Sequence, residues 1–296
     1  MHRFYIAPEN WNPDTLVLSG SEAHHARDVL RMKSGDKVVL FNGRGREITA
    51  EIVDPAKNGV RLRKLHETET PPLRCRIALG QAIPKGKNMD LIVQKAVEIG
   101  AAEIFPLISE RTIVDLEARE AAQKQEKWQT VAIEAAKQCG QNWLPPVHAP
   151  QNLKHFFGVE AAVLAAPKVA AATEGGSAAP VAAVSDRRTH ASGAPRAPLQ
   201  QQFDLRLIGS LQPGAMHLKK ILADYSSEQP VLSASRMDRH LPESVLMLIG
   251  PEGDFTPAEL ALARSHGCCP ITLGPIVLRV ETAAIYCLSV LSYELL

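Results

Sequence analysis

The chain has 296 residues, a length that predicts about two domains, and it is 45% hydrophobic and 22% charged. This composition supports a buried core and excludes a chain that is disordered throughout. The net charge is +1, from 33 basic and 32 acidic residues, so any argument for a nucleic-acid partner must rest on local charge. Five cysteines without a C-x-x-C spacing argue against a disulfide framework and against a cysteine zinc site.

The two ends of the chain carry no targeting or membrane signal. The first eight residues lack the apolar run of a signal peptide, and the apolar stretch 283–296 contains polar residues and is too short to span a bilayer. We therefore expect a soluble, cytoplasmic protein without a membrane partner.

Residues 1–71 have the pattern of a small β domain. Residues 38–41 are apolar and lead into Asn42-Gly43, a strong hairpin signal, and residues 47–53 alternate with a period near two. A second turn at 57–59 precedes the alternating run 60–63. The pattern favours a small β-barrel or sandwich. Pro71-Pro72 marks the domain boundary, because consecutive prolines extend neither a sheet ladder nor a helix.

Residues 72–296 alternate between strands and helices. We expect strands at 76–83, 103–108, 205–208 and 245–249, and helices at 90–99 and 116–139 that are each followed by a glycine. This alternation predicts a parallel α/β sheet. Residues from about 167 to 202 are rich in Ala, Pro, Gly and Ser, a composition that cannot offset its ordering entropy, so we expect a flexible insertion there.

The first of two loops with ligand-binding residue types is Gly250-Pro251-Glu252-Gly253. It follows a buried strand, and a helix begins directly after it with Thr256 as N-cap. Glycines let the backbone approach a ligand closely, and ligands bind at the carboxyl edge of α/β sheets. A plain tight turn is the alternative interpretation. The glycine fingerprints of dinucleotide and P-loop sites are both absent from the sequence.

The second loop runs from Thr272 to Ala284 and leads into the last helix. Arg279 and Glu281 lie there among apolar residues, where a charge is costly unless it is paired or functional. A purely structural ion pair between them is the alternative to a catalytic role. The helix that follows is apolar on more than one face, which indicates burial in its own core or against a second subunit.

A basic cluster lies in the N-terminal part. Residues 27–46 hold six basic side chains and two acidic ones, close to His24-His25. The local surplus of about four charges could follow a phosphate backbone, and an ordinary solvated face is the alternative. The adjacent histidines have no third ligand at a useful spacing, so we expect no metal site.

Four motifs together resemble a known family. They are Glu22-Ala23-His24-His25 through Phe41-Asn42-Gly43, Lys85-Gly86 through Gly100, Glu134 through Gly140, and the two C-terminal loops. In order and spacing they cover nearly the whole chain except the insertion. They resemble the RsmE family of bacterial 16S rRNA uracil-N3 methyltransferases, which belongs to the SPOUT superfamily.

The resemblance implies an α/β fold with a trefoil-knotted parallel sheet, a PUA-like β-barrel at residues 1–71, and a homodimer. It also implies S-adenosylmethionine (SAM) as methyl donor and 16S rRNA of the small ribosomal subunit as partner. In the family, three loops hold the cofactor; the matching residues are Ile208, Ser210, Leu211, Leu248, Ile249, Gly250, Pro251, Glu252, Gly253, Leu273, Gly274, Val277, Leu278 and Thr282. RNA contacts are expected from Arg3, His24, His25, Arg27, Arg31, Lys33, Arg44, Lys85, Lys87 and Arg111.

The implied reaction assigns roles to the two charged residues of the second loop. Uracil N3 becomes nucleophilic once its proton leaves, so Glu281 is the candidate base, and Arg279 could stabilise negative charge on the uracil oxygens. N3 lies on the pairing edge, so the target must be unpaired or flipped out of its helix.

The chain departs from the family pattern at two positions. Asp254 stands where a second glycine is usual, and Asp tolerates unusual backbone angles. Ile276 stands where an arginine is usual, so the chain lacks a cation that could contact a substrate there. This second departure keeps open a methyltransferase that acts on another rRNA or tRNA base. A non-catalytic RNA-binding assembly protein is the third hypothesis.

Overall fold

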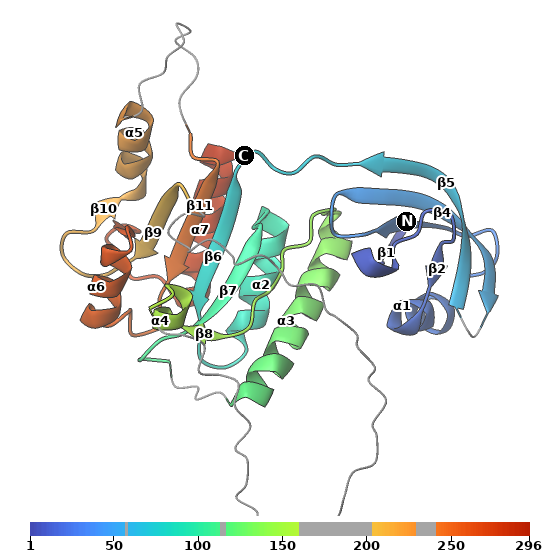
Figure 1. Ribbon diagram of the computed structural model, residues 1–296, viewed down its shortest axis with the longest axis horizontal. Helices are drawn as coiled ribbons and strands as arrows, with labels where there is room; N and C mark the ends of the chain where they lie inside the picture. The colour runs from blue at the N-terminus through green and yellow to red at the C-terminus, as the bar shows by residue number, and fades with distance from the viewer. Residues whose placement is uncertain (57–58, 113–116, 160–202, 229–240) are drawn as a thin grey trace, which may run out of the picture.

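The computed structural model describes residues 1–56, 59–112, 117–159, 203–228 and 241–296. These residues form two sheets side by side, and the long helix α3 (Ala118–Cys139) lies near their junction (Figure 1). The expected insertion at 167–202 and part of the expected turn at 57–59 lie outside the described residues. None of the described helices is long and apolar enough to cross a membrane.

The described N-terminal residues form a five-stranded sheet in the order β1–β3–β4–β5–β2. The strands are β1 (His2–Tyr5), β2 (Val17–Leu18), β3 (Lys37–Phe41), β4 (Arg46–Ala56) and β5 (Gly59–Glu69), and the short helical segments are η1 (Pro8–Asn10), α1 (Gly20–His24) and η2 (His25–Val29). The antiparallel β3–β4 hairpin confirms the predicted turn, whereas the parallel pairing of β1 with β3 was not expected. Two register shifts between β4 and β5 accompany the curvature of this long ribbon around a separate apolar core (Figure 1).

The β3–β4 turn connects the two sheets. Gly45 has φ +85°, and a Cβ there would lie 2.6 Å from the carbonyl oxygen of Thr70, so only glycine fits. Its N–H donates to the carbonyl of Asn142 at 2.9 Å, and the N–H of Leu144 donates to the carbonyl of Gly43 at 3.0 Å. The turn is therefore held against the segment that follows α3.

Seven described strands form the second sheet, in the order β10–β12–β9–β11–β6–β7–β8, and every pairing is parallel. The strands are β6 (Arg76–Ala82), β7 (Glu103–Ile108), β8 (Gln151–Asn152), β9 (Leu205–Gly209), β10 (Met216–His217), β11 (Ser244–Ile249) and β12 (Cys269–Thr272). The helices are α2 (Asn88–Ile99), α3, α4 (Leu153–Phe156), α5 (Leu218–Glu228), α6 (Pro257–Ser265) and α7 (Val280–Leu295). The predicted parallel α/β sheet is confirmed, and glycines end α2 and α3 as expected.

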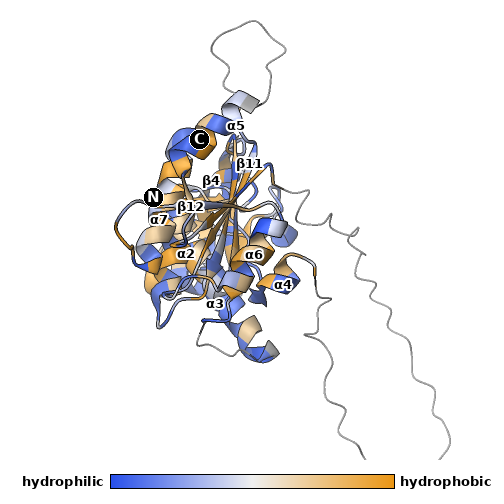
Figure 2. Ribbon diagram, turned by 90° about the vertical axis from the view of Figure 1, so that its left-hand side faces the viewer, coloured by the Kyte–Doolittle hydropathy of each residue, from blue (hydrophilic) through white to orange (hydrophobic). Residues whose placement is uncertain are grey.

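Alternate side chains of the central strands enter two cores, one on each face of the sheet. Leu79 and Met247 pack in the core that includes α2, α3 and α7, and Leu248 and Phe105 pack in the core that includes α4 and α6. Figure 2 shows hydrophobic residues gathered on the strands between these helices.

Helix α7 differs from the sequence-based expectation. Its buried residues follow one stripe, not several faces: Val280, Ala283, Ala284, Cys287, Leu288, Leu291 and Leu295. Tyr286 and Tyr293 are exposed on the helix. The trefoil knot and the second subunit stay predictions.

Candidate functional site

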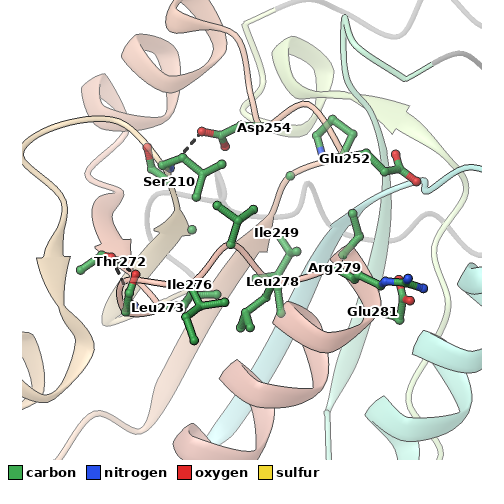
Figure 3. A pocket seen from close by; sticks show the side chains of 18 of the residues that line it. Ser210, Ile249, Glu252, Asp254, Thr272, Leu273, Ile276, Leu278, Arg279 and Glu281 are labelled. Carbon is green, nitrogen blue, oxygen red and sulfur yellow. Dashed lines mark hydrogen bonds between the residues drawn. The ribbon is translucent and has the colours of Figure 1, made fainter.

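A cavity of about 470 Å³ opens at the carboxyl edge of the second sheet. Its walls come from the loops that follow β9, β11 and β12, and Asn88 at the start of α2 completes the rim (Figure 3). β9 lies between β11 and β12 in the sheet, so the three loops meet at one edge. This is where ligands bind in open α/β sheets, and the volume is typical of a small-molecule site.

The cavity is apolar in the middle and polar at its ends. In Figure 3, Ile249, Leu273, Ile276 and Leu278 lie between two polar groups, Ser210, Asp254 and Thr272 at one end and Glu252, Arg279 and Glu281 at the other. Such a lining suits a ligand with a flat apolar part and charged groups beyond it.

Most of the predicted cofactor residues line this cavity. They are Ser210, Leu211, Ile249, Gly250, Pro251, Glu252, Leu273, Gly274, Val277 and Leu278, together with the candidate catalytic residues Arg279 and Glu281. Ile208 and Leu248 do not line it, because strand alternation buries their side chains in the core on the opposite face of the sheet. Gly253 faces Arg111 instead, and Thr282 is exposed on α7.

The cavity also contains residues that the sequence analysis assigned no cofactor role: Asn88, Gly209, Asp254, Thr272, Ile276, Val280 and Ala283. Asn88 is the first residue of α2, shortly after Lys85-Gly86, so a polar residue where a helix begins after a strand was the signal for it. Gly209 and Thr272 end their strands, and this position alone places them at the carboxyl edge.

The loop after β11 is tied to the loops after β6 and β7. Glu252 Oε1 accepts a hydrogen bond from the backbone N–H of Lys85 at 2.9 Å. The guanidinium of Arg111 donates to the carbonyl oxygen of Gly253. Two residues expected to contact RNA therefore also fix the loop after β11, Lys85 through its backbone and Arg111 through its side chain.

Helix α6 begins with a capping box at Thr256, the predicted N-cap residue. Thr256 Oγ1 accepts from the N–H of Glu259 at 3.2 Å, and Glu259 Oε2 accepts from the N–H of Thr256 at 2.9 Å. The buried Glu259 carboxylate also accepts from Ser109 Oγ at 3.0 Å and from the N–H of Glu110 at 2.9 Å. One carboxylate thus aligns the loops after β7 and β11.

The two departures from the family pattern both lie at the cavity. Asp254 has φ +62°, in the left-handed region, so Asp adopts the backbone conformation that favours glycine. Ile276 lines the cavity with a side chain that is 73% exposed. The rim is therefore apolar at the position where the resemblance led us to expect a cation.

Arg279 and Glu281 are not paired with each other. Glu281 Oε2 accepts a hydrogen bond from Asn88 Nδ2 at 3.2 Å. The Arg279 guanidinium has no hydrogen-bond or ion-pair partner within the part of the chain that the structure describes, and its backbone forms the N-cap of α7. The alternative interpretation, a structural pair between the two residues, is not supported by this geometry.

Arg3 was expected to contact RNA, but its side chain is bound by other residues of the protein. Its Nη1 lies 2.6 Å from Glu47 Oε2, and its Nη2 donates to Asn142 Oδ1 at 2.6 Å. The side chain is only 14% exposed. Arg3 therefore connects the two sheets and presents little surface to a phosphate.

Asp28, an acidic residue of η2, partly neutralises the positive charge of the basic cluster at residues 27–46. Hydrogen bonds from Arg27, and secondarily from His24, lower the pKa of the Asp28 carboxyl to about 2. The His25 ring packs edge-on against Phe4, with 6.0 Å between ring centroids. The remaining expected RNA contacts are exposed: Arg31, Lys33, Arg44, Lys85, Lys87 and Arg111.

Comparison with protein families agrees with the two-sheet organisation. A family model described as an RNA methyltransferase domain matches residues 71–185 and 206–292, and one described as an RNA methyltransferase PUA domain matches residues 18–65. Two curated relatives are both named ribosomal RNA small subunit methyltransferase E. The Synechocystis protein is 27% identical over 95% of this chain and 74% of its own length, and the Bacillus subtilis protein is 28% identical over 95% and 90%.

Solved structures show the same fold. A Legionella pneumophila protein with SAM bound as cofactor has a TM-score of 0.71 and 31% identity, covering 99% of this chain and 97% of that one. The Neisseria gonorrhoeae ribosomal RNA small subunit methyltransferase E, bound to SAM, has a TM-score of 0.71 and 27% identity, covering 99% and 98%. The family model covers well over half of the residues, and the chain therefore belongs to the RNA methyltransferase family.

Proposed function

We propose that this protein is a SAM-dependent methyltransferase that modifies N3 of a uridine in 16S rRNA of the small ribosomal subunit. The observation that carries the proposal is the cavity at the carboxyl edge, where three loops and the Arg279 and Glu281 side chains meet. The small-subunit names of the relatives support the substrate, and the SAM bound to two structural neighbours supports the cofactor.

The residues of the cavity fit SAM. Ile249 and Leu278 offer apolar surface for an adenine ring, and Gly250 lets backbone groups reach a ligand without an intervening side chain. Glu252 provides negative charge for a ligand that carries a sulfonium and an amino group. When bound, SAM supplies an electrophilic methyl group.

Glu281 is placed to accept the proton of uracil N3. It lies on the first turn of α7 at the cavity, and Asn88 holds its Oε2. Its Oε1 has no hydrogen-bond partner among the described residues, so this oxygen is free to accept a proton. A positioned base contributes about 10²- to 10⁴-fold to the rate.

Arg279 is placed to stabilise charge on the base. Deprotonation of N3 moves negative charge onto the neighbouring carbonyl oxygens, and a guanidinium offers five N–H donors in a fixed geometry. No carboxylate of the described residues pairs with Arg279, so these donors can bind substrate oxygens.

The proposed domain boundary lies between residues 71 and 72. The first sheet ends at Glu69 and the second begins at Arg76, and the two family models meet in the same region. We propose that the exposed cations Arg31, Lys33 and Arg44 of the first domain bind rRNA phosphates. We also propose a cytoplasmic location, where small subunits are assembled.

A homodimer is proposed from apolar side chains that the single chain leaves exposed. Ile276 and Val277 on the rim of the cavity and Tyr286 and Tyr293 on α7 are all exposed. Sedimentation equilibrium is expected to give twice the chain mass, and Tyr286→Asp is expected to shift the protein toward the monomer.

Methyl transfer with purified components tests the proposed function. The protein is incubated with methyl-labelled SAM and small subunits or free 16S rRNA, and the labelled nucleoside is identified after digestion. We expect 3-methyluridine. Another labelled nucleoside would favour a methyltransferase with a different target, and failure to bind SAM in calorimetry would favour an assembly protein without catalysis.

A further inference from the structure

Asp254 connects two of the loops that form the cavity. Its Oδ2 accepts a hydrogen bond from the backbone N–H of Leu211 at 3.0 Å, which Figure 3 shows as a dashed line at Asp254. Leu211 belongs to the loop after β9 and Asp254 to the loop after β11, and both residues line the cavity. The carboxylate of one cofactor loop therefore binds the backbone of another.

This bond continues the contact between two strands beyond their ladder. The pairing of β9 with β11 ends at Ile208 and Leu248, and the cavity opens beyond that pair. On its other side the loop after β9 is held by the N–H of Ser210, which donates to the carbonyl of Ile271 at 3.0 Å. Without the Asp254 side chain, the loop after β9 would keep this hydrogen bond to β12 and lose its hydrogen bond to the loop after β11.

Asp254 has a left-handed backbone conformation, which glycine adopts most easily, so the presence of a side chain there calls for an explanation. The N–H of Asp254 donates to the carbonyl of Pro251 at 3.0 Å, which closes a turn, and Asp254 itself follows that turn with φ +62°. Glycine would adopt this conformation at lower cost, and among other residues Asp and Asn tolerate it best. A glycine would adopt this backbone conformation but would leave two N–H groups without their side-chain acceptors, that of Leu211 at Oδ2 and that of Phe255 at Oδ1.

We propose that Asp254 is a positioning residue that holds the loop after β9 in the geometry that binds SAM. This inference rests on the proposed function, because it assigns the cavity to that cofactor. The bond restrains the loop, so it lowers the conformational entropy that cofactor binding must remove from the loop. Its loss raises the dissociation constant of SAM and its KM, and leaves kcat unchanged.

Three substitutions separate the bond from the backbone conformation. Asp254→Asn keeps an acceptor and tolerates the left-handed backbone, Asp254→Gly keeps only the backbone, and Asp254→Ala keeps neither. Titration calorimetry of the full-length protein is expected to give SAM affinity within about three-fold of the parent for Asn, about ten-fold weaker for Gly, and weakest for Ala. The product S-adenosylhomocysteine is expected to lose affinity by the same factors, because the bond orders the loop for both ligands.

Asp204 provides the matched control. Its Oδ2 accepts from the N–H groups of Glu243 at 3.0 Å and Ser244 at 2.9 Å, so it joins the chain where β9 and β11 begin, at the opposite edge of the sheet. Asp204→Gly is expected to lower the unfolding temperature without changing SAM affinity. In the ligand-free protein, hydrogen exchange at the Leu211 amide is expected to accelerate in Asp254→Gly and to stay unchanged in Asp204→Gly.

Two results would overturn the inference while leaving the proposed function intact. One is SAM binding by Asp254→Gly as tight as in the parent protein. The other is an Asp254→Asn variant as weak as Asp254→Gly, which would assign the effect to the negative charge rather than to the hydrogen bond. A parent protein that binds no SAM would instead refute the proposed function itself, and with it this role of Asp254.

Discussion

The two edges of the seven-stranded sheet use charged residues differently. At the amino edge, Arg76 Nη1 donates to Glu103 Oε1 at 2.8 Å, and His148 Nε2 lies 3.0 Å from Glu103 Oε2. The Arg76 guanidinium lies over the Phe203 ring, and the His148 ring stacks on Phe105 with 4.1 Å between centroids. Arg76, Glu103 and His148 thus contact one another and pack against aromatic rings, an arrangement that holds strands together.

At the carboxyl edge, Glu252, Arg279 and Glu281 form no ion pair with any described residue. Glu252 binds a backbone N–H, Glu281 binds the Asn88 amide, and Arg279 binds no described residue. Two opposite charges that form an ion pair neutralise each other. A charged group that is hydrogen-bonded to a neutral group can still attract a charged ligand. The amino edge therefore stabilises the fold, and the carboxyl edge keeps the groups to which we assign the proposed catalysis.

The largest effect is expected for Glu281→Gln at the carboxyl edge. The variant keeps the side-chain shape but cannot take the N3 proton, so turnover is expected to fall about 10²- to 10⁴-fold. SAM affinity, measured by calorimetry, should stay within a factor of about two, because the proton acceptor acts on the RNA base. A rate close to that of the parent protein would remove Glu281 from the role of base.

The amino edge is expected to give the opposite result. Glu103→Ala leaves Arg76 and His148 without their shared carboxylate, and urea unfolding should show a loss of about 2 kcal/mol, less than for a fully buried pair. Turnover at a temperature where the variant is folded should not change. A loss of rate as large as that of Glu281→Gln would contradict the division between the two edges.

Gly250→Val tests whether SAM binding requires the backbone of the loop after β11 to pack closely against Phe255. A Cβ at Gly250 would lie 3.2 Å from the Phe255 ring and 3.2 Å from the N–H nitrogen of Phe255, so a branched side chain must displace the loop. SAM affinity is expected to fall about ten-fold, with little change in the unfolding temperature. Parent-like affinity would show that the loop tolerates a side chain there.

The smallest effect is a pH dependence at the amino edge. Burial, and secondarily the Asp204 carboxylate, raises the pKa of the Cys75 thiol from 9.0 to about 11. Between these values the unfolded chain has lost a proton that the folded chain keeps, so stability falls as the pH rises. Between pH 8 and pH 10 the Cys75→Ala variant should lose about 1 kcal/mol less than the parent.

Cys139→Ala is the matched control for this prediction. Cys139 is exposed, so its variant controls for the loss of one thiol without the loss of a buried one. Equal pH slopes for the parent and for Cys75→Ala would show that the Cys75 thiol titrates alike in both states.

The local parts of the fold could be predicted from the sequence. The Asn42-Gly43 turn, the Thr256 capping box and the glycines after α2 and α3 each follow from residues within a few positions of one another. The carboxyl-edge location of the two glycine-containing loops followed from strand-to-helix order alone.

Contacts between distant segments could not be predicted. Arg3 was expected to bind RNA, and no local pattern shows that Asn142, 139 positions away, accepts from it. The hydrogen bond between Asn88 and Glu281 could not be predicted for the same reason, because the two residues are 193 positions apart. Ile208 and Leu248 were assigned to the cofactor by resemblance to the family. Which residue of a strand faces the cavity depends on the alternation of its side chains, and in β11 the side chain of Ile249 faces it.

Reverse transcription across small-subunit rRNA from cells with and without the gene tests the central claim most directly. A methyl group on uracil N3 blocks base pairing and stops the polymerase one nucleotide before the site. The account predicts one stop that is present with the gene, absent without it, and not restored by Glu281→Gln. An identical stop pattern in both strains would contradict N3 methylation of this rRNA by the protein.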